Sequence, residues 1–160
     1  MRERVCDYPR PPALVDSSEH VRVEALGRVL CDTRRSLRVL ETFHPPTYYL
    51  PPEAMTMSLL LPAEGRSFCE WKGIARYFDV VVDAGLASER RLQRAVWSYL
   101  EPTAAFAALA GWFAVYPRLM DGCWIDGQRA TPQPGGFYGG WISLNVIGPF
   151  KGDPFHPELI

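Results

Sequence analysis

The sequence lacks the features of several large classes of protein. No apolar run approaches the ~20 residues of a membrane-spanning helix, and the N-terminal MRERVCDYPRPP contains no apolar stretch of signal-peptide length. We therefore expect a cytoplasmic protein. Lysine and arginine number 17 against 18 acidic residues, giving a net charge of -1. A chain with so little net charge has no general attraction to nucleic acid or to membrane surfaces, so neither is a predicted partner.

Motifs for metals and cofactors are also missing. The chain has four cysteines without a CxxC pair and three isolated histidines, namely Cys6, Cys31, Cys69, Cys123, His20, His44 and His156. Zinc ligands and disulfide frameworks normally show close pairing, so we expect reduced, partly buried thiols and no metal site. No GxGxxG, Walker or GxSxG spacing occurs, which disfavours a phosphate cradle and a serine-hydrolase elbow. We expect no cofactor.

Strand signals dominate what is present. A chain of 160 residues fits one domain that buries roughly 70% of its unfolded surface. We predict an extended, proline-rich arm over residues 1–18, a single domain over 19–152 and a tail over 153–160. Within the domain, alternation of polar and apolar residues or β-branched and aromatic content predicts strands. The predicted strands are 20–24 and 29–31 as a hairpin, 36–41, 55–61 before a turn at 64–66, 75–82, a strand ending at 97–99, and 123–125.

One segment favours a helix. Residues 103–113 are rich in alanine, which has the highest helix propensity, and Pro102-Thr103 supplies a start signal. The fold class is therefore mainly β (α+β), with one or two short helices.

The glycine-rich segment TPQPGGFYGGW, which begins at Thr131, carries aromatic side chains between glycine pairs. Glycine lets the backbone pass close to a ligand or another chain, and the aromatic rings supply flat surface. Three interpretations stay open: a pocket wall, a docking arm, or a cover for a sheet edge.

Polar-tipped aromatic groups recur in three other motifs, HPPTYY, CEWKG and WSYLE. A lysine among aromatic rings serves as a base or binds a carboxylate as a point charge, while tyrosine and glutamate exchange protons. The candidate catalytic residues are Lys72, Glu101 and Tyr49. The candidate ligand-binding residues are His44, Tyr48, Trp71, Tyr77, Trp97, Tyr99, Phe137, Tyr138 and Trp141.

These motifs together resemble the domain of unknown function 427 family. The resemblance rests on HPPxYYxP from His44, FCEWKGxAxY from Phe68, AxWSY from Ala95, and PQPGGFYGGW with GPFKG. It implies a β-tent fold, in which two antiparallel sheets meet at a cleft. Relatives by fold include methionine sulfoxide reductase B and the drug-binding domain of cereblon, many of which hold zinc with two CxxC pairs. This chain lacks those pairs, so neither the zinc nor the reductase chemistry carries over.

Two functions are expected from these observations. The first is a small-molecule pocket that performs cofactor-independent acid–base chemistry on a small anionic or aromatic metabolite, with lyase, isomerase and hydrolase reactions all left open. The second is a non-catalytic interaction module that uses the PQPGGFYGGW arm to engage a protein or a second copy of the chain as a homodimer.

Overall fold

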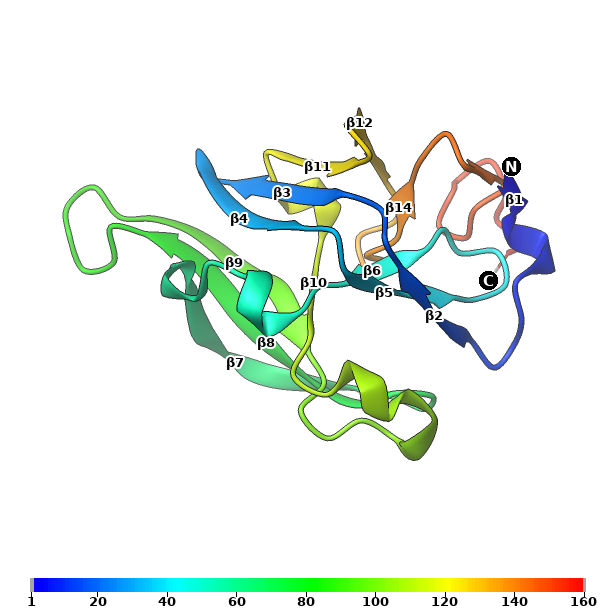
Figure 1. The fold of residues 1–160 in the computed structure, drawn as a ribbon, viewed down its shortest axis with the longest axis horizontal. Helices are drawn as coiled ribbons and strands as arrows, with labels where there is room; N and C mark the ends of the chain where they lie inside the picture. Colours follow the sequence, from blue (N-terminus) through cyan, green and yellow to red (C-terminus); the bar gives the residue numbers. More distant parts are fainter. Residues whose placement is uncertain (1, 160) are drawn as a thin grey trace.

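The computed structural model describes residues 2–159, and strands are its main regular structure (Figure 1). In these described residues, fifteen strands are joined by loops and by five short 3₁₀ helices. Two four-stranded antiparallel sheets and one three-stranded antiparallel sheet make up most of the fold. The predicted mainly β class is confirmed. No helix within residues 2–159 has both the length and the apolar character needed to cross a membrane.

The first four-stranded sheet has the order β12-β11-β3-β4. Its strands are β3 (Val21–Ala25), β4 (Arg28–Thr33), β11 (Gly122–Ile125) and β12 (Gln128–Arg129). The predicted β3–β4 hairpin is confirmed, and Leu26 and Gly27 turn it with φ of 51° and 73°. Positive φ at both central residues matches the right-handed twist of the flanking strands. The alternate residues Val21 and Val23 are fully buried in the main core.

The second four-stranded sheet has the order β10-β9-β8-β7 and the longest strands. They are β7 (Leu60–Cys69), β8 (Gly73–Val82), β9 (Arg90–Ser98) and β10 (Phe113–Val115). The predicted turn at residues 64–66 is wrong, because β7 continues through it as a bulge between Pro62 and Arg66. The Arg94 side chain donates to the Glu64 carbonyl and holds this bulge against the sheet. Pro62 is tolerated because β7 is an edge strand.

The three-stranded sheet includes the N-terminal segment. It comprises β2 (Ala13–Ser17), β5 (Ser36–Leu40) and β6 (Thr47–Tyr49), in the order β2-β5-β6. Residues 2–18 of the predicted arm contain short strands and a 3₁₀ turn and pack against the rest of the chain: β2 pairs with β5 over its whole length, and Val5 is fully buried. Directly after β6, Leu50 and Phe113 exchange two backbone hydrogen bonds of 2.7 and 2.9 Å. This bridge joins the three-stranded sheet to β10 at a corner.

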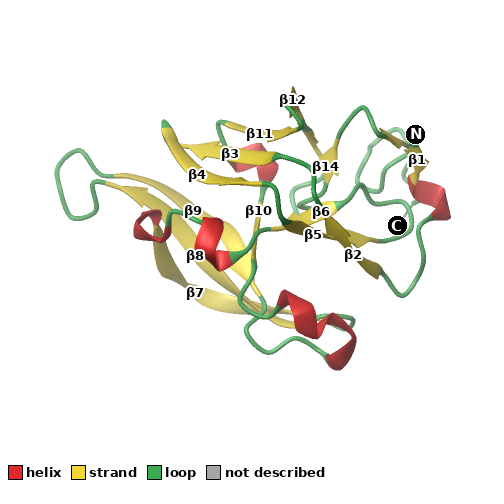
Figure 2. Ribbon diagram, in the orientation of Figure 1, coloured by secondary structure: helices red, strands yellow, loops and turns green. Residues whose placement is uncertain are grey.

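The helix predicted for residues 103–113 is wrong in type and length. The segment forms η4 (Ala104–Leu109), a kinked 3₁₀ helix with non-helical angles at Phe106, and β10 has begun by Phe113. Only Phe106 and Leu109 in η4 are buried, and their spacing of three residues fits the 3₁₀ repeat. An alanine-rich segment this short gains too little from propensity alone to form an α-helix. The other 3₁₀ helices are shorter, with three residues each (Figure 2): η1 (Val5–Asp7), η2 (Pro52–Ala54), η3 (Met57–Leu59) and η5 (Pro117–Leu119).

The C-terminal segment completes the core. It contributes β13 (Thr131–Pro132), β14 (Trp141–Ile142) and β15 (Val146–Ile147), and β15 pairs in parallel with β1 (Glu3–Arg4). Both ends of the chain therefore lie on the same side of the molecule (Figure 1). Trp141 is fully buried and packs its ring 4.8 Å from that of Tyr48. This segment is thus a structural part of the domain.

Candidate functional site

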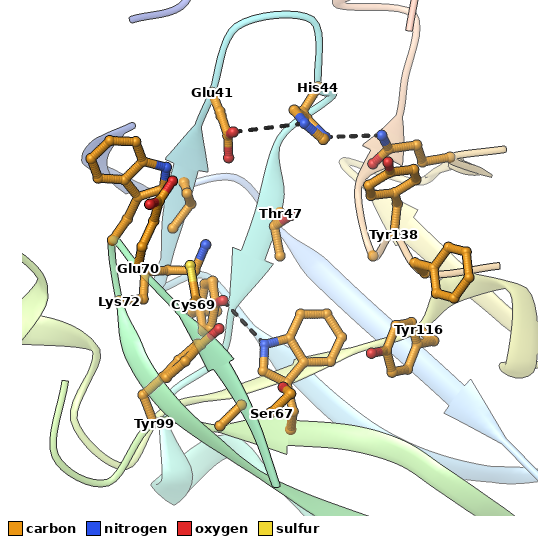
Figure 3. A pocket seen from close by; sticks show the side chains of 18 of the residues that line it. Glu41, His44, Thr47, Ser67, Cys69, Glu70, Lys72, Tyr99, Tyr116 and Tyr138 are labelled. Carbon is orange, nitrogen blue, oxygen red and sulfur yellow. Dashed lines mark hydrogen bonds and ion pairs between the residues drawn. The ribbon is translucent and has the colours of Figure 1, made fainter. Parts of the chain in front are cut away.

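A cavity of about 370 Å³ lies where the three-stranded sheet meets the second four-stranded sheet (Figure 3). Ligand pockets in proteins range from about 300 to 1,000 Å³, so this cavity suits a small metabolite. The glycine-rich segment closes one wall, since Phe137, Tyr138 and Gly139 belong to the lining. Of the three interpretations of this segment, the pocket wall describes its position.

Most of the residues singled out in the sequence meet at this cavity. Those that line it are Lys72, Tyr49, His44, Trp71, Tyr77, Trp97, Tyr99, Phe137 and Tyr138. They come from motifs far apart in the chain, which pairing of β8 with β9 and the bridge after β6 bring together. Three predicted residues lie elsewhere: Tyr48, Trp141 and Glu101.

Tyr48 and Trp141 face the opposite side of the sheet from the cavity. Successive side chains of a strand point to opposite faces, so Tyr49 enters the cavity while Tyr48 enters the main core. The Tyr48 hydroxyl donates to Glu19 at 2.9 Å, and its ring contacts Trp141. Both residues thus support the wall from behind.

Glu101 lies in the exposed loop that follows β9. Its backbone carbonyl abuts Gly73, at the start of β8, but its side chain is not part of the cavity lining. The acidic groups of the lining are instead Glu41 and Glu70. Figure 3 shows Glu41 beside His44, with Glu70 near Lys72.

Several lining residues were not among the candidate site residues named from the sequence. They are Val39, Glu41, Thr47, Ser67, Cys69, Glu70, Ala75, Tyr116, Gln133, Gly139 and Lys151. Some carried a signal: Glu41 precedes His44 by three residues, Gln133 lies within TPQPGGFYGGW, and Lys151 lies within GPFKG. Tyr116 had none, because only the fold brings it near the Trp97 ring, at 4.6 Å.

Gln133 fixes the orientation of His44. Its side-chain oxygen accepts from the Gly140 N–H at 3.2 Å, so its amide nitrogen is the donor to the Lys151 carbonyl at 2.8 Å. The same nitrogen lies 3.0 Å from Nδ1 of His44, which must therefore accept. Neutral His44 consequently carries its proton on Nε2, the atom 3.8 Å from a Glu41 carboxylate oxygen.

The surroundings keep His44 neutral. Its side chain is only 14% exposed, and burial lowers the pKa of the imidazole from its usual 6.5. The positive charges of Lys151 and Lys72 also lower this pKa, while Glu41 opposes them. The Tyr138 ring meets the imidazole edge-on at 5.3 Å. His44 is thus held as a hydrogen-bond donor through Nε2–H.

Two ammonium groups in the lining have no acidic partner. Within residues 2–159, neither Lys72 nor Lys151 has a carboxylate oxygen within 4.0 Å. Lys72 is set in the turn between β7 and β8, where its carbonyl accepts from the Thr103 N–H at 3.0 Å. Within residues 2–159 the lining therefore holds two ammonium groups outside any ion pair, together with the carboxylates of Glu41 and Glu70.

The phenols of the cavity floor are hydrogen-bonding groups rather than bases. Burial raises the pKa of Tyr49, and that of Tyr99, well above the usual value of a phenol. Trp97 donates its indole N–H to the Tyr49 oxygen at 3.2 Å. The Tyr49 hydroxyl is therefore protonated near neutral pH, where it is available as a donor.

The cysteines do not fit a zinc site. Cys31 and Cys123 are buried in the main core on strands that flank β3, Cys69 lines the cavity, and Cys6 is exposed. Burial raises the pKa of the Cys31 thiol to about 12, which disfavours the thiolate that zinc requires. The zinc of the wider fold thus has no equivalent ligand set within residues 2–159.

Comparison with known proteins gave one family. The model of the family described as domain of unknown function (DUF427) matches residues 13–126, more than half of the chain. The match runs from β2 to the end of β11 and includes His44, Glu41 and Lys72, but it ends before Gln133. No curated protein matched the sequence. The chain belongs to the DUF427 family.

Proposed function

We propose that this protein binds a small anionic metabolite in the cavity and transfers a proton to or from it. The observation that carries the proposal is the orientation of His44 by Gln133, which aims an N–H donor beside the Glu41 carboxylate. A buried amide that satisfies two backbone groups and also orients an imidazole is the kind of support that acid–base sites require.

The two lysines of the lining support an anionic ligand. Lys72 and Lys151 have no acidic partner in the described chain, and both lie close enough to affect the pKa of His44. A carboxylate that reaches either ammonium group would gain a charge-assisted hydrogen bond. Trp71 and Trp97 supply apolar surface that excludes water from such a contact.

Glu41 and His44 have separate roles in the proposed reaction. Glu41 takes a proton from a carbon next to the carbonyl of the bound molecule, and the electron pair moves onto the carbonyl oxygen. Nε2–H of His44 donates to that oxygen, since a neutral imidazole can stabilise a developing oxyanion. Lys72 or Lys151 holds the carboxylate end, and the proton returns from Glu41 to the product.

Proton exchange with solvent tests this function directly. The protein is incubated in D₂O with pyruvate, α-ketobutyrate and phenylpyruvate, and loss of the proton signals next to the carbonyl is followed by NMR. We expect exchange faster than in buffer, with Glu41→Gln slowing the catalysed rate by about a hundredfold or more. Lys72→Met should abolish the thermal stabilisation that the bound keto acid produces.

Glu101→Gln is the matched control, because Glu101 is exposed and lies outside the lining. It should exchange protons as the wild type does. If the wild type accelerates exchange of none of the three acids, or if Glu41→Gln exchanges as fast as Glu101→Gln, proton transfer by Glu41 is excluded.

A second candidate function is the interaction module. Phe137 is 87% exposed at the tip of the glycine-rich segment, as a docking residue would be. Deleting this segment would expose buried Trp141, so a point variant is the better test. Phe137→Ser should lower the apparent mass in solution scattering if the segment forms a homodimer. An unchanged mass excludes that dimer.

A further inference from the structure

A second hollow of about 540 Å³ adjoins the cavity. The two share four lining residues, Ser67, Tyr77, Tyr116 and Phe137, so they adjoin along a common wall. The shared wall is aromatic with polar tips: the Ser67 and Tyr77 hydroxyls lie 2.6 Å apart, and the Tyr116 ring packs against Trp97. A ligand that occupies the cavity can thus extend over this wall.

Two arginines line the second hollow beyond the shared wall. The Arg94 guanidinium lies over the Tyr77 ring at 4.0 Å from its centre and donates one N–H to the Glu64 carbonyl. The Arg118 guanidinium lies over the Tyr116 ring at 5.5 Å and donates to the Gly136 carbonyl at 3.1 Å. Each side chain is held by one carbonyl and one ring, and each retains further N–H donors.

Neither of these arginines forms an ion pair within residues 2–159, although others nearby do. Arg91, on the same strand as Arg94, pairs with Asp79 at 2.6 Å and with Glu89 at 3.5 Å. A solitary exposed arginine is usually only solvated. Here two lie in one hollow, on the rings of the wall that it shares with the cavity.

We propose that the bound molecule carries a second oxyanion, which Arg94 and Arg118 hold. Its first anionic end lies at Lys72 and Lys151, and a flat or apolar middle section crosses Tyr77 and Tyr116. The ligand class is therefore an elongated small molecule with an oxyanion at each end. This inference rests on the cavity of the proposed function as the site of the first end. The planar guanidinium fork suits a carboxylate or a phosphate, and the test uses carboxylates.

Calorimetric titration with matched acids tests the second oxyanion. The probes are adipate, suberate, sebacate and terephthalate, each compared with the monocarboxylate of the same skeleton: hexanoate, octanoate, decanoate and benzoate. We expect at least one diacid to bind about tenfold tighter than its monoacid, the gain from one charge-assisted contact. The series covers several lengths, so the best diacid also reports the separation of the two charged ends.

The variant Arg94→Gln/Arg118→Gln should remove the preference for diacids while monoacids bind unchanged. Arg76→Gln is the control, because Arg76 is an exposed arginine of β8 outside both hollows. If loss of the Glu64 contact unfolds the double variant, Arg118→Gln alone should still reduce the preference. Diacids that bind no tighter than monoacids, or a preference that survives both variants, would overturn the second site.

Lys72→Met separates this inference from the proposed function. It should weaken monoacids and diacids alike, because both place a carboxylate at Lys72. Monoacid binding that responds to Lys72→Met, without any preference for diacids, supports the cavity and rejects the arginine site. If no acid of either series binds, the anionic ligand of the proposed function and the second oxyanion are both excluded.

Discussion

Gln133 donates a hydrogen bond to Nδ1 of His44 across 3.0 Å, although 89 residues separate them in the sequence. Gln133 is only 3% exposed, and its other contacts are to the backbone at Gly140 and Lys151. The glycine-rich segment thus decides which ring nitrogen carries the proton in a side chain that the HPPTYY motif supplies. This relationship leads to the first two predictions.

Gln133→Glu should reverse the tautomer of His44. A carboxylate can only accept, so Nδ1 would become the protonated nitrogen and the imidazolium form would gain a charged partner. We expect the pKa of His44 to rise and the protein to lose about 1–3 kcal/mol of stability, because the Lys151 carbonyl loses its donor. Nitrogen-15 NMR of labelled histidine reports both the tautomer and the pKa. A wild-type Nε2–H signal in this variant would contradict the assigned orientation.

Stability should depend on pH through His44. Its pKa is lower in the folded protein than the usual 6.5, so the unfolded chain binds more protons once the pH falls below about 7. The free energy of unfolding therefore decreases as the pH falls through 6.5 and levels off below the folded pKa. Urea unfolding between pH 7.5 and 5 should show this decrease. In His44→Gln, the free energy of unfolding should change less with pH over the same range, and this difference separates the effect of His44 from that of the other two histidines. Equal pH dependence in the wild type and the variant would refute the prediction.

Gly139→Ala should disturb the cavity wall. A Cβ at Gly139 would overlap the Trp97 ring, which is itself held by the bond to Tyr49. We expect a loss of about 1–3 kcal/mol, as for other overpacked sites, together with a change in tryptophan fluorescence.

Gly136→Ala is the control for that substitution. A methyl group on Gly136 would have open space around it out to 4 Å, and the residue does not require a positive φ. Its unfolding midpoint in urea should stay close to that of the wild type. Equal midpoints for the two alanine variants would show that the segment does not press on Trp97.

The sequence predicted strands better than helices. Val21 and Val23 alternate with charged residues, and such a pattern is stable only with one face buried, so the first hairpin could be located correctly. The α-helix predicted for the alanine-rich segment does not form, because helix propensity takes no account of tertiary contacts. In the fold, the backbone of Phe113 is hydrogen-bonded to Leu50 as part of a strand. Residues 64–66 likewise remain in β7 rather than forming the expected turn, and Arg94 of β9 donates a hydrogen bond to the Glu64 carbonyl there.

The types of residue in the candidate site were predicted from the sequence, but not which individual tyrosines and glutamates line the cavity. Tyr49 and Tyr48 are neighbours with the same side chain, and only the direction of the strand decides which one enters the cavity. Glu101 directly follows the WSYL sequence, yet it lies in an exposed loop. Glu41 lies near His44 because residues 41–44 form a turn, in which the His44 N–H donates a hydrogen bond of 2.9 Å to the Glu41 carbonyl.

The sequence by itself determined the β-rich class, the family and the aromatic character of the site, because these depend on local patterns and on motifs that can be read along the chain. Only the tertiary structure decided which charges meet. His44, Gln133 and Lys151 lie far apart in the sequence, and their contact depends on how the C-terminal segment packs through buried Trp141. Long-range packing of that kind leaves no periodic signal, so the protonated nitrogen of His44 and the adjoining positions of the cavity and the second hollow became visible only in the folded chain.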